Sequence, residues 1–360
     1  FGIEDLAVSQ NVAAILMNTS YPLEIVELYK DLGWKNGKFY FDRIYGSDTE
    51  SLYIGAKSKV FEINGEDRDG VKKIMKELFQ IPIFTILSGG VISGLYNEAI
   101  GLEEPLNINI RGKRGLGKTT VLKIVISFLC KQNLLFHDFN STSNGIEDAR
   151  AELNPMAVVI DDREIGERGK STDEILKEIM RNSTVKSRTR SGSWSSGNNK
   201  RIHGALISSS VNSIVDIIGR NKDVGQNRRF FEFDMDLKNC NTKRLIEIES
   251  FFSENYGIGI RMLLEYMEVN NLGESELKEL FQEKQEVVKK YIDKLEDSTL
   301  KDEMEPCTAR IAVVLASADL ISKAFGGIKY DEFAILDLFV EDAYNKVTTR
   351  EFYSPYKLKE

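Results

Sequence analysis

Hydrophobic and polar positions follow two different periods along this chain of 360 residues. Between about residues 106 and 233, short apolar or alternating runs recur, and segments with helical spacing separate them. The predicted strands cover 106–110, 134–139, 157–160, 205–207 and 229–233, and the predicted helices lie near 118–130, 145–153, 171–180 and 211–218. Five strands separated by helices predict an α/β fold with a parallel sheet and helices on both faces.

The segments before residue 106 and after residue 233 show different patterns of hydrophobic and polar residues. A short helix is expected over 22–32, and alternating runs at 38–44, 52–54 and 59–63 predict a small β-rich module. Helical spacing over 70–99 is broken at Pro82, and after residue 238 only helical patterns appear, charged over 274–302 and apolar over 309–325. We therefore expect an N-terminal α+β module over 1–66, an α/β core over 67–237 and a helical C-terminal lid region over 238–360.

Composition narrows the possible classes of protein. The formal net charge of -8 excludes a protein that coats nucleic acid with its whole surface, although it permits a local basic site. Three widely spaced cysteines favour a reducing cytoplasm over a secreted, disulfide-linked domain. The apolar stretch 81–96 contains three glycines and predicts a buried helix with no membrane span, and the residues after Phe1 show no secretory signal pattern.

Residues 112–119, which read Gly-Lys-Arg-Gly-Leu-Gly-Lys-Thr, match the phosphate-loop pattern G-x-x-x-x-G-K-[ST]. Glycines let backbone N–H groups surround a phosphate, the lysine reaches the β- and γ-phosphates, and the threonine hydroxyl binds Mg²⁺. The motif follows a predicted strand and opens a predicted helix, as this chemistry requires. The expected nucleotide-binding residues are Gly112, Gly115, Gly117, Lys118, Thr119 and Thr120.

A carboxylate pair at the end of the strand 157–160 predicts the second half of an ATP and Mg²⁺ site. Asp161 is expected to hold Mg²⁺ together with Thr119, and Asp162 to polarise the attacking water. Aspartate at position 162 is shorter than the usual glutamate, so Glu164 remains a rival catalytic base.

The order of the motifs indicates how the strands are arranged. A strand at 134–139 lies between the two motifs in the sequence, which is the arrangement of RecA-like and AAA+ proteins. The strand 205–207 should then lie between the motif-bearing strands and present a polar side chain to the γ-phosphate. The spacing does not select among Ser208, Ser209, Ser210 and Asn212, and the middle serine, Ser209, serves as the candidate.

Arginines near the fifth strand and in the C-terminal region are further candidates. Arg228 and Arg229 precede the fifth strand, where AAA+ rings place an arginine finger that reaches a neighbouring subunit. One of the two is expected to act in this way. Arg310 is the candidate for a lid arginine that senses nucleotide.

Basic residues are concentrated in one segment of this acidic chain, and no acidic residue occurs between Glu178 and Asp216. Alternation over 185–190, a glycine- and serine-rich stretch over 191–197 and a basic return predict a β-hairpin inserted before the fourth strand. Fixed cations bind backbone phosphates, and an aromatic side chain at the tip can stack on a base. The candidate DNA-binding residues are Lys186, Arg188, Arg190, Trp194, Lys200 and Arg201.

Taken in order, these motifs resemble the ATPase domain of primase-helicases encoded by phages, plasmids and genomic islands. The segments that carry the resemblance are 32–37, the phosphate loop 112–120, 159–162, the basic stretch, the serine-rich strand end, 225–229 and 309–312. The family is similar to the MCM-like self-loading replicative helicases of staphylococcal mobile genetic elements. The resemblance implies a P-loop NTPase of RecA-like or AAA+ type.

The function expected from the resemblance is an ATP- and Mg²⁺-dependent DNA helicase motor. It would form a hexameric ring, hydrolyse ATP between subunits, and translocate on single-stranded DNA at a replication fork, with the basic hairpin lining the pore. Two alternatives remain open: a non-unwinding AAA+ switch in defence, signalling or loading, and a nucleotide-gated DNA-binding scaffold. No membrane partner is expected.

Overall fold

The computed structural model describes residues 32–35, 37–46, 63–102, 104–132, 136–137, 150, 153–163, 184–188, 194–215, 228–235 and 242–352. Of the predicted helix near 211–218, residues 211–215 are described, and residues 214 and 215 are helical. The predicted helices near 22–32, 145–153 and 171–180 lie wholly or mostly outside the described ranges. The same is true of the predicted strands at 52–54 and 59–63.

A parallel β-sheet forms the centre of the molecule. Its strands are β4 (Asn107–Arg111), β5 (Phe136–His137), β6 (Val158–Arg163), β9 (Leu206–Ser210) and β10 (Phe231–Asp234). They lie in the order β10-β4-β9-β6-β5, and every neighbouring pair is parallel. Because β5 has only two residues, the four longer strands make up most of the sheet. The α/β class is confirmed, and β9 lies between β4 and β6 as the motif order predicted.

The alternation along β4 reflects two different sheet faces. Ile108 lies against helix α3 (Pro82–Ile100), where a Cβ on Gly90 would come within 2.8 Å of the Ile108 Cδ1 atom. On the other face, the Asn109 side-chain amide donates hydrogen bonds of 2.8 Å to Ser210 Oγ and to Glu232 Oε1. Buried amides of this kind need such partners, so the asparagines mark a buried polar face rather than an exposed one.

Helix α3 is buried along nearly its whole length and packs against helix α13 (Thr308–Ala324). Its glycines permit close approach: a Cβ on Gly94 would lie 1.8 Å from the carbonyl oxygen of Pro155, and one on Gly89 would lie 2.7 Å from that of Val314. By length and composition α3 could cross a membrane, but 89% of its apolar window is buried inside the protein. It is therefore a core helix, as the interrupting glycines suggested.

The N-terminal β-rich module is described as a three-stranded antiparallel sheet of β1 (Gly33–Lys35), β2 (Lys38–Tyr40) and β3 (Ile44–Tyr45). The sequence predicted one strand over 38–44, but the chain turns back after β2, where the N–H of Phe41 donates to the carbonyl of Arg43. Apolar Phe41 and Ile44 flank Asp42 and Arg43 here, so the mixture of apolar and polar residues alone does not mark the turn. β1 was not predicted at all.

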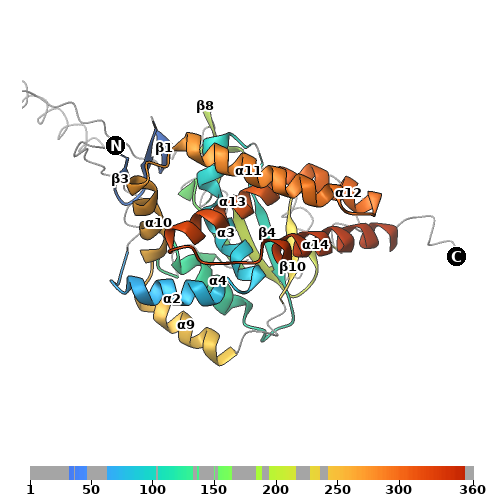
Figure 1. Ribbon diagram of the computed structural model, residues 1–360, viewed down its shortest axis with the longest axis horizontal. Coiled ribbons are helices and arrows are strands. Elements are labelled where there is room, and N and C mark those ends of the chain that lie inside the picture. Colours follow the sequence, from blue (N-terminus) through green and yellow to red (C-terminus); the bar gives the residue numbers. More distant parts are fainter. Residues whose placement is uncertain are drawn as a thin grey trace, which may run out of the picture.

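The C-terminal region is helical, as predicted. It contains α9 (Thr242–Glu254), α10 (Ile258–Val269), α11 (Glu274–Asp293), α12 (Ser298–Met304), α13 and α14 (Glu332–Phe352), and α11 to α14 gather on one side of the sheet (Figure 1). Helix α2 (Arg68–Leu78) precedes α3. Buried apolar residues from the N-terminal sheet, the α/β core and these helices form one continuous cluster.

Helix α14 protects the edge strand β10 with a buried ion pair. Asp342 Oδ1 accepts a hydrogen bond of 2.9 Å from the N–H of Glu232, and Lys346 Nζ donates one of 2.6 Å to the carbonyl of Phe230. The two side chains are also paired with each other at 2.7 Å, and each is only 2% exposed. One helix thus satisfies backbone groups that a further strand would otherwise bind.

Candidate functional site

The phosphate loop joins β4 to helix α4 (Lys118–Ser127). Gly115 and Gly117 have φ values of +83° and +82°, in the left-handed region that glycine adopts without strain. The N–H of Gly112 donates to the carbonyl of Ser210 at 3.1 Å, which fixes the start of the loop to β9. No side chain caps the N-terminus of α4, so its first backbone N–H groups form the kind of end that binds phosphate.

The Lys118 side chain folds across this loop. Its Nζ donates hydrogen bonds of 2.7 Å to the carbonyl of Gly112 and 3.1 Å to that of Lys113, and the residue is only 8% exposed. These contacts hold the ammonium group above the loop, where a β- or γ-phosphate would lie.

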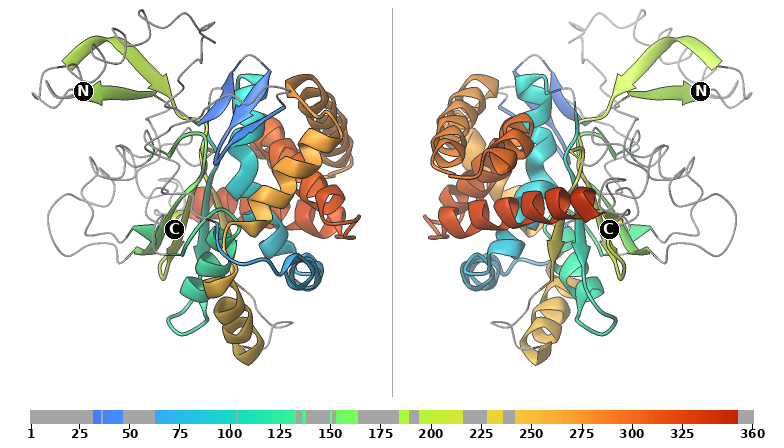
Figure 2. Two further views of the ribbon diagram at one scale, coloured as in Figure 1. Left: turned by 90° about the vertical axis from the view of Figure 1, so that its left-hand side faces the viewer. Right: turned by 90° about the vertical axis from the view of Figure 1, so that its right-hand side faces the viewer.

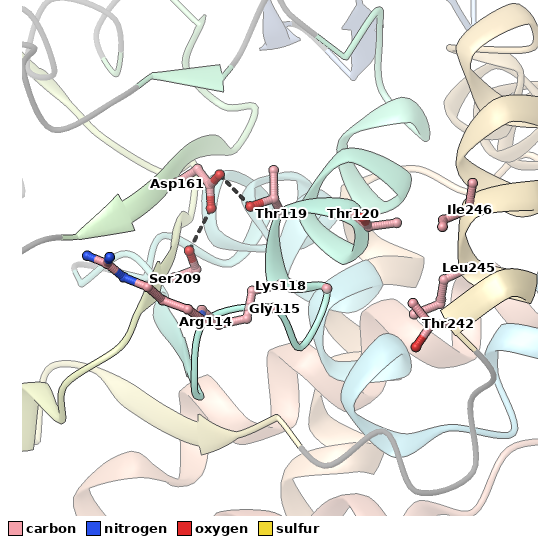
Figure 3. Close-up of a pocket in the computed structure, with 11 residues that line it drawn as sticks. Arg114, Gly115, Lys118, Thr119, Thr120, Asp161, Ser209, Thr242, Leu245 and Ile246 are labelled. Atoms are coloured by element: carbon pink, nitrogen blue, oxygen red, sulfur yellow. Dashed lines mark hydrogen bonds between the residues drawn. The ribbon is translucent and has the colours of Figure 1, made fainter.

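Three elements bring oxygen atoms together beside the loop (Figure 3). Thr119 Oγ1 of α4 and Ser209 Oγ of β9 each donate a hydrogen bond of 2.7 Å to the Asp161 carboxylate of β6. Ser208 and Ser210 bond instead to Asn109 on the other face of the sheet. Of the three candidate serines, the fold therefore brings Ser209 to the acidic residue, because alternate residues of a strand face opposite sides.

A pocket of about 410 Å³ opens around these groups, within the range of small-ligand sites. Its lining joins the phosphate loop and strand ends to one face of α9: Arg114, Gly115, Gly117, Lys118, Thr119, Thr120, Asp161, Ser209, Thr242, Leu245 and Ile246. Sequence reasoning missed Arg114, which occupies a variable position inside the motif. It also missed the three residues of α9, since no sequence pattern links them to the loop.

The oxygen atoms of Thr119 and Asp161 fit Mg²⁺, which prefers hard oxygen ligands and keeps several waters beside one or two carboxylates. When bound, the ion would neutralise charge on phosphate oxygens. Within the described residues, no three His, Cys, Asp or Glu side chains form a separate metal cluster. Asp162 lies in β6, but its side chain and all of Glu164 fall outside the described residues. The identity of the catalytic base stays a prediction.

Arg228 and Arg229 lie at the opposite edge of the sheet. They precede β10, which runs parallel to β4, so the five-residue length of β4, about 16 Å, separates them from the phosphate loop. Arg228 Nε lies 3.3 Å from the buried carboxylate of Glu303, and its Nη2 donates to the carbonyl of Asp302. Arg229 Nε lies 3.6 Å from the half-exposed carboxylate of Glu104. Neither arginine reaches the pocket of its own chain.

Arg310 is not brought to the pocket either. It is 6% exposed, its Nη1 lies 3.6 Å from Glu104, and its guanidinium carbon lies 5.6 Å from the centre of the Phe231 ring. Its Nη2 also lies 3.4 Å from Cys307 Sγ. Helix α13 thus directs this arginine into the core near the amino end of the sheet. Arg310 therefore lies away from the pocket that a nucleotide bound to the same chain would occupy.

The basic segment forms the predicted β-hairpin, with β7 (Thr184–Arg188) antiparallel to β8 (Trp194–Arg201). The hairpin projects from the body, away from the C-terminal helices (Figure 2). Trp194 was expected in a flexible tip, but it lies in β8 opposite Arg188, and Lys186 lies opposite Asn199. Lys200 and Arg201 end β8, whereas Arg190 lies outside the described residues.

The return strand of the hairpin is fixed to the core. The Asn154 side chain donates to the carbonyl of Arg201 at 3.1 Å and accepts from the N–H of His203 at 2.6 Å. Asn97 of α3 donates to the carbonyl of His203 at 2.9 Å. These bonds tie the base of the hairpin to the segment before β6 and to α3.

A buried carboxylate supports the loop after β9. Glu232 Oε1 accepts a hydrogen bond of 2.7 Å from the N–H of Ile214, and Ser213 Oγ donates to Oε2. Burial raises the pKa of Glu232, and the bonds from Ser213 and Ile214 and the charge of Arg111 offset part of that effect. Glu232 was not predicted from the sequence, because the sequence of one strand does not show that a glutamate in it is buried and hydrogen-bonded to a distant loop.

Three comparisons place the chain among known proteins. Residues 2–181 match the family described as "Domain of unknown function (DUF927)". No curated protein matches the chain. Among solved structures, the protein described as "SCCmec type IV Cch - active helicase" superposes with a TM-score of 0.68 at 19% identity, over 96% of this chain and 65% of that one. The predicted resemblance to mobile-element helicases is thus confirmed at the level of the fold, and the present chain spans about 65% of that protein's length.

A second solved structure is the C-terminal region of NrS-1, described as "The A form apo structure of NrS-1 C terminal region-CTR". It matches 97% of this chain and 66% of its own at 14% identity, with a TM-score of 0.34. That value does not establish a shared fold.

Proposed function

Because the chain belongs to the DUF927 family and shares its fold with a helicase, we propose that it is an ATP-dependent DNA helicase motor of the P-loop class, RecA-like or AAA+ in type. Lys118, Thr119, Asp161 and Ser209 lie around one pocket, and this arrangement is the main support for the proposal. A phosphate loop, a strand-end carboxylate and a polar group on the strand between them are the parts that phosphoryl transfer requires.

Each part has a chemical task in ATP hydrolysis. Lys118 and the first N–H groups of α4 would hold the phosphates, while Thr119 and Asp161 would hold Mg²⁺. Ser209 would sense the γ-phosphate through the carboxylate it already contacts. Asp162 or Glu164 would orient the attacking water.

The position of Arg228 and Arg229 favours catalysis between subunits. An arginine that does not reach its own phosphate loop could act on the loop of a neighbouring subunit, as expected in a ring, and a hexamer is the expected assembly. Arg228 is tied to buried Glu303, whereas the Arg229 side chain pairs, among the described residues, with half-exposed Glu104 at 3.6 Å. Arg229 is therefore the better candidate for the finger, because the weaker, solvated contact costs less to exchange.

The projecting hairpin is the proposed contact with single-stranded DNA and the replication fork. Its fixed base would pass a change in the core, driven by hydrolysis, to Lys186, Arg188, Trp194, Lys200 and Arg201. Arg190, outside the described residues, stays a candidate from the sequence alone. Few phosphate contacts per subunit suffice in a ring, since linked sites raise effective affinity.

Cys130 and Cys307 are buried and form no disulfide, which suits a reducing cytoplasm.

Strand displacement on a forked duplex with Mg²⁺ and ATP tests the proposal. Unwinding by the wild type and its loss in Lys118→Ala are expected, and ATP turnover should rise when single-stranded DNA is added. Turnover without unwinding or DNA stimulation would favour a non-unwinding switch instead. DNA binding with negligible turnover would favour a nucleotide-gated scaffold. The hairpin role fails if the triple variant Lys186→Ala, Arg188→Ala, Trp194→Ala keeps full stimulation by DNA.

A further inference from the structure

The pocket extends in two directions from Lys118. On one side lie the polar atoms of Thr119, Asp161 and Ser209, and on the other side lies the face of α9 (Figure 3). Thr120 lies between Lys118 and α9 in the same view. The two ends therefore differ sharply in chemistry.

The α9 end is aliphatic. Leu245 is 1% exposed and anchors the helix in the core, whereas Ile246 is 57% exposed although it lines the pocket. Thr242 adds one hydroxyl at the start of the helix. An exposed aliphatic side chain on a pocket wall gains free energy when a ligand surface covers it and removes it from water.

This wall is fixed relative to the phosphate loop. Lys123 of α4 forms an ion pair of 3.0 Å with Glu249 of α9, and Ile248 and Phe252 of α9 are buried in the core beside Leu245. The distance between the loop and Ile246 is therefore set by packed helices rather than by a loose loop.

The orientation of a bound nucleotide follows from the polar groups at one end of the pocket. With a γ-phosphate and Mg²⁺ held beside Asp161 and Thr119, the α-phosphate would lie toward Thr120. The ribose and base must then extend toward α9, the remaining part of the pocket. This step rests on the proposed function, because it takes the phosphate loop to bind a nucleoside triphosphate.

We propose that Ile246, supported by Leu245 and with Thr242 at its edge, is the wall that contacts the nucleobase. The flat face of a base packs on the aliphatic surface. Among the described residues that line this end, only the Thr242 hydroxyl offers a side-chain hydrogen bond. Sites that discriminate strongly do so by hydrogen bonds to polar edges, whereas apolar contact discriminates weakly. The site therefore accepts both adenine and guanine nucleoside triphosphates.

The test measures dissociation constants of ATP, GTP and inorganic tripolyphosphate, each with Mg²⁺, for the wild type, Ile246→Ala and Val269→Ala. Val269 is 79% exposed on α10 and does not line the pocket, so it is a matched aliphatic control. The wild type should bind ATP and GTP within about threefold of each other and more tightly than tripolyphosphate. Ile246→Ala should weaken ATP and GTP by about three- to tenfold and leave tripolyphosphate unchanged, while Val269→Ala changes nothing.

Several results overturn the inference. These are unchanged ATP affinity in Ile246→Ala, an equal loss for tripolyphosphate, or a preference between ATP and GTP above about tenfold in the wild type. Wild-type binding of ATP no tighter than tripolyphosphate would also overturn it, while leaving the phosphate site intact. A protein that binds neither ATP nor tripolyphosphate would instead overturn the proposed function, and this inference with it.

Discussion

Charged and polar side chains have opposite surroundings in two regions of the parallel sheet: the carboxyl ends of its strands, and the edge strand β10. At the carboxyl edge, Thr119 is exposed and Asp161 is partly exposed beside an open pocket. Around the edge strand β10, Asp342, Lys346 and Glu303 are buried and bind groups of their own chain. In this fold, polar side chains that face the pocket are available to a ligand, whereas those covered by helices bind and stabilise groups of their own chain.

The largest expected effect is the loss of activity in Lys118→Ala. ATP turnover should fall by at least about a hundredfold, because the cation that faces the phosphates is removed. The free energy of unfolding should change by less than about 1 kcal/mol, since water in the pocket can replace the ammonium at the loop carbonyls. Steady-state turnover and urea denaturation check both expectations.

Lys113→Ala is the matched control for that substitution, because Lys113 is an exposed lysine of the same loop. It should retain most of the turnover. A Lys118→Ala protein that kept more than a tenth of wild-type turnover would contradict the assignment of this edge to phosphate binding.

The second expected effect separates the paired arginines. Arg229→Ala should lower turnover by about a thousandfold without changing the affinity for ATP, as expected of a residue that acts on the neighbouring subunit. Arg228→Ala should instead lower the free energy of unfolding by about 1–3 kcal/mol, because buried Glu303 loses one of its cations and keeps Arg350. Equal losses of turnover in both variants would remove the distinction.

The third expected effect concerns the buried pair on α14. Lys346→Met leaves the Asp342 carboxylate buried without its cation, so the free energy of unfolding should fall by about 3–5 kcal/mol. Adding Asp342→Asn should recover part of the loss. Lys323→Met is the control, since Lys323 forms the same i,i+4 pair with Asp319 but is 49% exposed and should cost about 1 kcal/mol or less. Similar costs at both sites in urea denaturation would refute the role given to burial.

The smallest expected effect is on the pH dependence of stability. Burial raises the pKa of Glu232 above its ordinary value of 4.5, so the folded state holds this proton to higher pH than the unfolded state does. The stability contributed by protonation is fully present below about pH 4.5 and is lost as the pH rises through the raised pKa.

Glu232→Gln should therefore flatten the decline in the free energy of unfolding between about pH 4.5 and neutral pH. Asp342, whose pKa burial also raises, keeps part of the slope. Urea midpoints at the two pH values provide the measurement. An unchanged slope would show that Glu232 does not titrate as its burial implies.

The sequence by itself determined the helices and strands with a clear hydrophobic period and the motifs whose residues are close together in the chain. The phosphate loop, the strand before it, the helix after it, the break at Pro82 and the basic hairpin are local patterns, because backbone geometry and turn chemistry act over a few residues. The motif order even predicted that β9 lies between β4 and β6.

Only the tertiary structure decided what depends on distant segments. It selected Ser209 among three serines, because only that residue's side chain faces Asp161. It placed Arg310 in the core, joined Ile246 to the phosphate loop, and showed that Lys346 and Glu232 are buried. A side chain's partners across the sheet or on a packed helix are set by long-range packing, which no local period records.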